Sequence, residues 1–315
     1  MTASEKVLPL PLRLLTHNIR YATSSPFTGE RPWAERAPLV INQIRHETRS
    51  FTSRSRGGGP ASFVCLQEVL HSQLLDILHG LNRLLPPSHP DAEPPRGPVW
   101  AHIGVGRDDG ETQGEYSPIF YPVDAFDLLH VETVWLSPTP NRPSKGWDAG
   151  SIRILTVGVF EHKLSQQRVI ASNTHLDNSG ARSRLESIAI ILRTLRRIES
   201  EWGRDGQVGI FLAGDFNSFP TQAAYQAMES AGYLQDVHNV AGPEGRHGET
   251  MTFTGFRPDE DRHLQGRIDF VWLGPRGDTA KQWAVEQYSV LPNRFDAGVY
   301  LSDHRAVVGD VTLLC

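Results

Sequence analysis

The sequence predicts a layered α/β or α+β fold, because short apolar segments alternate with helical segments along its 315 residues. Nine segments have the length of strands and are rich in β-branched or aromatic residues: 12–19, 62–69, 99–105, 118–122, 152–160, 168–175, 208–213, 268–273 and 305–314. Strands interleaved with helices in this way favour sheets whose outer faces are covered by helices.

Three helices are predicted between these strands. Apolar residues recur at helical spacing over 74–81 and again over 188–198. The second of these helices should end near Gly203, because glycine often follows the last helical turn. A third helix is predicted where Thr221, which follows Pro220, can act as a cap, and it should end near Gly232.

Two segments have the composition of mobile loops. Residues 50–60 read SFTSRSRGGGP, and residues 86–98 read PPSHPDAEPPRGP, which has too many prolines for a helix or an inner strand. We interpret both as loops rather than domain linkers, because the candidate chemical residues run from Asn18 to His304 and have to meet in one site. The sequence therefore predicts a single catalytic domain over residues 1–315.

The composition is that of a globular protein, with 39% hydrophobic and 21% charged residues. The sequence has no apolar run of about 18 residues, so no spanning helix or membrane anchor is predicted. The two cysteines cannot form a disulfide framework; Cys65 is expected to be a buried thiol, and an intracellular, cytoplasmic or nuclear, location is expected. The net charge of −5 argues against a broad basic surface for long duplexes, although it leaves room for a local positive groove.

Polar residues gather where the predicted strands end. They are Asn18, Gln67, Glu68, His175, Asp215, Asn217, Asp269, Asp303 and His304. Each of them alone is most often a turn residue, a helix cap or a structural histidine. Together they combine carboxylates, amides and two histidines, and the sequence has no G-x-S-x-G, P-loop or H-E-x-x-H motif that would compete with them.

These residue types are suited to hydrolysis of a phosphate ester. Glu68, Asp303 and Asn18 offer oxygen ligands, which Mg²⁺ and Mn²⁺ prefer. Asp215 and Asn217 lie two residues apart, so one can orient a water while the other donates to an anion. A pair of Asp269 with the His304 ring would favour the imidazolium. A metal, an oriented water and an imidazolium together supply what phosphoryl transfer needs.

The motifs resemble those of the endonuclease/exonuclease/phosphatase superfamily of DNase I-like enzymes. They are THNIRY at 16–21, LQEV at 66–69, NTHL at 173–176, GDFN at 214–217, RIDF at 267–270 and SDH at 302–304. The blocks at 104–121 and 135–148 resemble a largely uncharacterised bacterial and fungal branch. The resemblance implies a four-layer α/β sandwich, in which two packed mixed β-sheets are flanked by helices.

The resemblance also implies roles for particular residues. Glu68 would bind the metal with support from Asn18 and Asp303. Asp215 would handle the attacking water, and Asn217 would hold a phosphate oxygen. The remaining expected catalytic residues are His304 braced by Asp269, His175 at the phosphate or leaving oxygen, and Tyr116, which would reach the phosphate. Arg107, Arg184 and Trp147 are candidate substrate contacts, with solvated arginines and tryptophan packing as the alternatives.

The first functional hypothesis is a Mg²⁺/Mn²⁺-dependent phosphodiesterase acting on nucleic acid, single-stranded or short, or on a small nucleotide-like diester. The alternative is a phosphomonoesterase or phospholipase-type enzyme acting on a metabolite, a sugar phosphate or a lipid head group. A third hypothesis is a non-catalytic binding protein that keeps the fold. An inositol phosphate substrate is disfavoured, because this chain has QGRIDF where the inositol 5-phosphatases have P-A-W-C-D-R. No protein partner is inferred.

Overall fold

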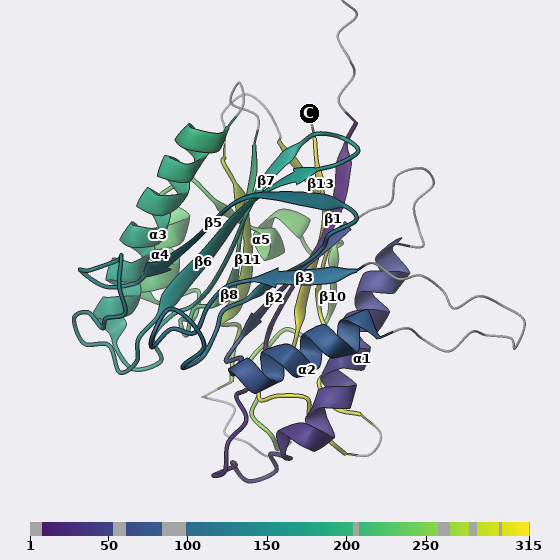
Figure 1. Ribbon diagram of the computed structural model, residues 1–315, viewed down its shortest axis with the longest axis vertical. Helices are drawn as coiled ribbons and strands as arrows, with labels where there is room; N and C mark the ends of the chain where they lie inside the picture. The colour runs from purple at the N-terminus through teal and green to yellow at the C-terminus, as the bar shows by residue number, and fades with distance from the viewer. Residues whose placement is uncertain are drawn as a thin grey trace, which may run out of the picture.

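Two mixed β-sheets pack face to face, and helices cover the outer face of each (Figure 1). The computed structural model describes residues 8–52, 61–83, 99–203, 208–257, 265–276, 282–295 and 298–314. This arrangement is the predicted four-layer sandwich. Among the described residues, none of the helices combines the length and the apolar character needed to cross a bilayer.

The first sheet has seven strands. Their order is β10 (Arg246–Gly248), β12 (Trp283–Val290), β13 (Val307–Leu313), β1 (Leu10–Asn18), β2 (Ala61–Gln67), β4 (Ile119–Pro122) and β3 (Trp100–Ile103). β1 pairs parallel to β2 and antiparallel to β13. Every residue of β2 is buried, as expected for a central strand that is covered on both faces.

The second sheet has six strands. Their order is β5 (Phe126–Trp135), β6 (Ile154–His162), β7 (Arg168–His175), β8 (Gly209–Asp215), β11 (Asp269–Gly274) and β9 (Gln235–Asp236). β7 and β8 are parallel, whereas β8 and β11 are antiparallel. The end of β7, the end of β8 and the start of β11 therefore lie at the same edge of this sheet.

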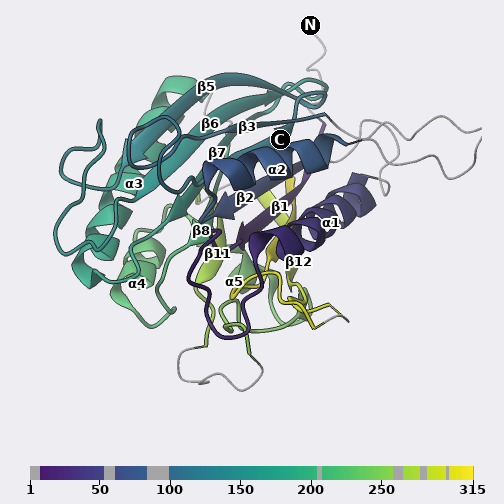
Figure 2. The same cartoon turned by 60° about the horizontal axis from the view of Figure 1, so that its bottom comes forward.

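Helices α1 (Trp33–Thr52) and α2 (His71–Asn82) lie side by side over the first sheet (Figure 2). Helices α3 (Ala181–Trp202) and α4 (Ala223–Ser230) cover the second sheet. The short helix α5 (Val237–Ala241) contacts β11 and β12.

Three apolar clusters separate the four layers. The cluster between the sheets contains Phe63 of β2, whose ring centroid lies 5.1 Å from that of Phe160 and 5.3 Å from that of Phe211 in the opposite sheet. One outer cluster joins α3 and α4 to the second sheet, and the other joins α1 and α2 to the first. Side chains that alternate along β1 face the inner cluster and the outer one in turn, which fixes the register of the strand.

All nine predicted strands and all three predicted helices are present, to within a few residues at their ends. Cys65 is buried, as expected. The expected cap at Thr221 is wrong, because Gln222 occupies the N-cap position of α4. The predicted loop 50–60 is wrong at its start, because α1 continues to Thr52. Residues 53–60 and 84–98, which contain the rest of both predicted loops, lie outside the described residues.

Candidate active site

The pairing of the strands brings the candidate polar residues to one edge of the two sheets. In the second sheet Asp215 pairs with His175 on one side and with Asp269 on the other. In the first sheet Asn18 pairs with Gln67, directly before Glu68. Strand register brings these residues together. Asn18 also approaches the segment before β13, because its backbone oxygen accepts a 2.6 Å hydrogen bond from Ser302 Oγ, next to Asp303 and His304.

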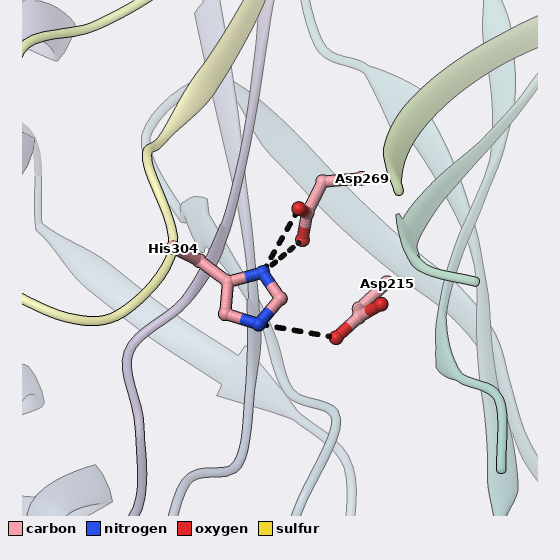
Figure 3. A group of neighbouring side chains, drawn as sticks. All are labelled: Asp215, Asp269 and His304. Atoms are coloured by element: carbon pink, nitrogen blue, oxygen red, sulfur yellow. Dashed lines mark hydrogen bonds and ion pairs between the residues drawn. The ribbon is translucent and has the colours of Figure 1, made fainter. Parts of the chain in front are cut away.

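The ring of His304 lies between two buried carboxylates (Figure 3). Its Nδ1 is 2.9 Å from Asp269 Oδ2, and its Nε2 is 3.7 Å from Asp215 Oδ2. Burial opposes a charge on the ring, but the Asp269 and Asp215 carboxylates outweigh it and raise the pKa of His304 well above its usual value. The geometry therefore favours an imidazolium that faces Asp215 with its Nε2–H.

Asp215 is held in place by two donors. Asn18 Nδ2 donates to its Oδ2 over 3.1 Å, and the backbone N–H of Asn217 donates to its Oδ1 over 2.8 Å. Burial, together with the Asp269 charge, raises the pKa of Asp215 to about 7. A carboxylate of this kind is a better proton acceptor than an ordinary aspartate.

Glu68, Asn18 and Asp303 form the candidate metal centre. Asn18 Nδ2 donates to Glu68 Oε1 over 3.0 Å, so this amide bridges Glu68 and Asp215. Asn18 Oδ1 accepts one hydrogen bond, from the backbone N–H of Arg20, and keeps a lone pair for a cation. Burial and the Glu68 charge both raise the pKa of Asp303, although His304 and Arg20 oppose this. Two neighbouring carboxylates and an amide oxygen suit a hard divalent cation.

The ligand atoms of Asp215, Asp269 and His304 also lie within 4.8 Å of one another, close enough to hold a metal ion. However, the Nδ1 atom of His304 is already hydrogen-bonded to Asp269. This direct contact favours a carboxylate–imidazole pair at these residues, with the cation at Glu68, Asn18 and Asp303.

His175 completes the polar edge. Its Nε2 lies 3.4 Å from Asp215 Oδ2 and 2.9 Å from Asn217 Nδ2. Its Nδ1 lies 2.8 Å from Arg153 Nη1. Burial and the Arg153 charge lower the pKa of His175 well below its usual value, so the ring is neutral.

Of the other predicted contacts, Tyr116 and Arg107 line a small pocket together with Arg153 and His175, and their polar groups are bonded to further residues. The Tyr116 hydroxyl is bonded to the Glu111 carbonyl and to His71 Nδ1, both over 2.9 Å. Arg107 donates to Glu115 Oε2 over 2.6 Å, and Arg184 donates to the Asp177 carbonyl over 2.8 Å.

Trp147 is half-buried and packs against the apolar cluster beneath α3. This packing is the alternative reading that the sequence left open for Trp147.

Two arginines that received no role from the sequence contact the group. Arg153 bonds to His175, and Arg20 Nη1 lies 3.6 Å from Glu68 Oε2. Both side chains are largely buried, which is rare for arginine unless it is paired. The available signals were an arginine between the isoleucines of the predicted strand 152–160 and another arginine two residues after Asn18.

Backbone strain is concentrated at the same edge. Arg20, Glu68 and Asn217 have φ values of 57°, 57° and 45°. Non-glycine residues seldom adopt this left-handed region, and it recurs at functional sites where surrounding contacts over-determine the conformation.

The sequence profile of the Endonuclease/Exonuclease/phosphatase family matches residues 15–304, which is most of the chain. The chain belongs to this family. Members of the endonuclease/exonuclease/phosphatase family hydrolyse phosphoesters and typically depend on a divalent metal, so this chain is assigned to the phosphoester hydrolases. A comparison with curated proteins found no match.

Solved structures of the family superpose on nearly the whole chain. One from Bacteroides vulgatus is 30% identical, covers 96% of this chain and 99% of its own, and has a TM-score of 0.76. One from Bacteroides thetaiotaomicron is 28% identical, with coverages of 98% and 100% and a TM-score of 0.77. A mannosyl-6-phosphatase from Bacteroides thetaiotaomicron is 28% identical, with coverages of 95% and 99% and a TM-score of 0.75.

Proposed function

We propose that this chain is a Mg²⁺- or Mn²⁺-dependent enzyme that hydrolyses the phosphoester of a small, sugar-containing molecule. The observation that carries hydrolysis is the buried group of Asp215, Asp269 and His304 beside Asn18 and Glu68. The substrate class is supported by the mannosyl-6-phosphatase, which is 28% identical over 95% of this chain. We also propose that residues 1–315 act as one catalytic domain, since the site draws on both sheets.

In this proposal Glu68, Asn18 and Asp303 hold the cation. A bound divalent ion would polarise a phosphoryl oxygen and offset the negative charge that builds up on the phosphoryl group. The donor set fits this ion, because the Glu68 and Asp303 carboxylates are close enough for their charges to interact and the Glu68 side chain keeps 15% of its surface exposed.

Asp215 is proposed to orient the attacking water and accept its proton. The two hydrogen bonds from Asn18 and Asn217 fix the carboxylate so that it does not have to reorganise during the reaction. The His304 imidazolium is proposed to donate from Nε2 to the phosphoryl oxygens, while Asp269 holds the ring through Nδ1. This division of roles matches the environments of the three side chains.

His175 and Asn217 are proposed to donate to the phosphate. An arginine can only donate, so Arg153 favours the tautomer in which Nδ1 accepts and Nε2 carries the proton; the Asn217 amide, whose Nδ2 lies 2.9 Å from Nε2, would then turn its N–H away from the ring. His175 therefore acts as a neutral hydrogen-bond donor rather than as a charged acid. This refines the role at the leaving oxygen that the family resemblance implies.

The second candidate is phosphodiester hydrolysis, on short nucleic acid or on a nucleotide-like diester. It is supported by the same machinery, because the carboxylate, the imidazolium and the cation act on the P–O bond that monoesters and diesters share. A phospholipase-type activity would use the same residues. The net charge of −5 favours small substrates over long duplexes in each case.

A substrate panel tests the proposal. Purified protein with Mg²⁺ or Mn²⁺ is assayed on hexose 6-phosphates, bis-aryl phosphate, labelled single-stranded DNA and RNA, and a lipid diester. We expect the highest kcat/KM on a hexose phosphate. Faster cleavage of the diesters would favour the second candidate. Binding without turnover of any of these esters would favour a non-catalytic protein.

A further inference from the structure

The loop between β1 and α1, residues 19–32, presents an exposed aromatic ring beside the candidate metal centre. Phe27 is 55% exposed. The Arg20 guanidinium carbon lies 4.4 Å from the centre of the Phe27 ring, and Nη1 of the same guanidinium lies 3.6 Å from Glu68 Oε2. Arg20 therefore covers one face of Phe27 and connects the ring to the carboxylate that would hold the metal.

Glu30 fixes the position of Phe27. The buried Glu30 side chain accepts the Phe27 backbone N–H at Oε2 over 2.9 Å, and the Glu30 N–H donates to the Phe27 carbonyl over 3.0 Å. Glu30 Oε1 lies 3.4 Å from Arg20 Nε and 3.8 Å from Arg36 Nη2. Two buried arginines thus hold the carboxylate that closes this turn, so the ring is supported on a rigid element.

The same loop lies against the segment that leads back to His304. Gly29 has φ of 89°, and a Cβ on it would come within 2.6 Å of the Phe256 carbonyl oxygen. Three residues earlier in that segment, the Phe253 ring centre is 5.0 Å from that of His304. The loop that carries Phe27 therefore contacts Glu68 through Arg20 and, through Gly29, the segment that contains Phe253.

We propose that Phe27 is a stacking subsite for a ring carried by the phosphorylated substrate. The guanidinium occupies one face and more than half of the side chain is exposed, so the opposite face is open. An aromatic side chain binds other rings by stacking face to face, and every nucleobase gains binding free energy from such stacking. This inference rests on the proposed function: the phosphate would lie at Glu68 and the ring attached to it would reach Phe27.

Two kinds of substrate carry a ring next to the phosphate: a hexose phosphate and a nucleotide. Kinetics on three monoesters separate them: glucose 6-phosphate, adenosine 5′-monophosphate and glycerol 3-phosphate, which has no ring. For Phe27→Ala we expect KM to rise roughly 5- to 100-fold on a ring-bearing substrate. The kcat on all three substrates, and KM for glycerol 3-phosphate, should stay close to wild type. Phe27→Tyr should restore KM.

Leu75→Ala is the matched control, because Leu75 is an exposed apolar side chain on α2. An equal loss on all three substrates would mean that Phe27 only supports Arg20, and no change would mean that it is surface packing; either result overturns the proposal. Calorimetry then tests the stacking subsite separately from the proposed hydrolysis. It measures the binding of glucose 6-phosphate and adenosine 5′-monophosphate to metal-loaded wild type and to Phe27→Ala. Weaker binding by Phe27→Ala in protein that turns over neither ligand would support the subsite while removing the proposed function, and equal binding by both proteins would remove the subsite.

Discussion

Arg153 Nη1 donates to His175 Nδ1 over 2.8 Å, and Asn217 Nδ2 lies 2.9 Å from Nε2 of the same ring, so a donor group faces each ring nitrogen. Arg153 is itself balanced by carboxylates, with Nε 3.6 Å from Asp177 Oδ2 and Nη1 3.7 Å from Glu115 Oε2. The charge on Arg153 is thus compensated while one of its N–H groups is committed to the ring. His175 Nε2 faces Asp215, with Oδ2 at 3.4 Å.

Arg153→Met should lower kcat, because the His175 ring loses the buried donor that holds it in position. We expect a loss of roughly 10- to 100-fold, below the full value of an acid–base residue. Arg153→Lys, which keeps a charged donor, should recover part of the loss. The measurement is kcat of folded protein, with Arg168→Met as the control, since Arg168 pairs with Glu161 outside this group. Equal kcat for Arg153→Met and wild type would contradict the role of Arg153.

Removal of metal should abolish turnover. EDTA-treated protein should be inactive, and Mg²⁺ or Mn²⁺ should restore it, because the centre at Glu68, Asn18 and Asp303 offers only oxygen ligands. Glu68→Gln should weaken cation binding by roughly 10-fold or more, as one formal charge leaves the centre. Calorimetric titration with Mn²⁺ measures this, and Glu35→Gln, on the exposed surface of α1, is the control. Undiminished turnover after stripping the metal would sink this assignment.

Asp269 and His304 should behave as one unit. His304→Ala and Asp269→Asn each remove the oriented imidazolium, so each should lower kcat by roughly 10²- to 10⁴-fold. The double variant should be little worse than the worse single variant. The kcat values of the three folded proteins decide the question. Fully additive losses would show that the 2.9 Å contact is not used in catalysis.

His162, far from the site, should make stability depend on pH. It is 5% exposed, its Nδ1 accepts the Ser165 N–H over 3.1 Å, and burial lowers its pKa. The unfolded chain therefore takes up a proton near pH 6.5 that the folded chain refuses. The free energy of unfolding should fall as pH drops below that value, by up to about 1.4 kcal/mol per pH unit from this group.

Urea unfolding at pH 7.5 and pH 5.5 measures the effect. His162→Gln should lose less stability than wild type between the two pH values. His79→Gln, an exposed histidine on α2, should keep the wild-type difference. The same difference for His162→Gln and wild type would rule out His162 as the source.

The sequence predicted the buried strands well, because a strand covered on both faces is a continuous apolar run, as β2 and β8 are. It did not predict α1, β5 or β12. Most of β5 is exposed or half-buried, and α1 carries Pro38 inside a strongly polar helix. The packing that stabilises these elements comes from residues far away in the chain, so local pattern gave little signal.

The residues of the candidate site also divide into those that the sequence predicted and those that it did not. Residues at strand ends, such as Asn18, His175 and Asp215, were found because strand ends are local features. Arg20 and Arg153 were given no role, because the burial of an arginine depends on partners elsewhere in the chain, here Glu30 and Asp177. Tyr116 lines a small pocket with Arg153 and His175, where its hydroxyl is bonded to Glu111 and His71. The direction of a side chain is fixed by tertiary contacts rather than by its motif.

The most direct test of the central claim, that Asp215 handles the attacking water, is kcat of Asp215→Asn with Mg²⁺ on the best substrate of the panel. The amide keeps the shape of the side chain and its oxygen can still accept one of the two hydrogen bonds, so the variant should fold and bind substrate with KM near wild type. Loss of the proton acceptor should lower kcat by roughly 10²- to 10⁴-fold. A folded Asp215→Asn enzyme with near wild-type kcat would contradict the account.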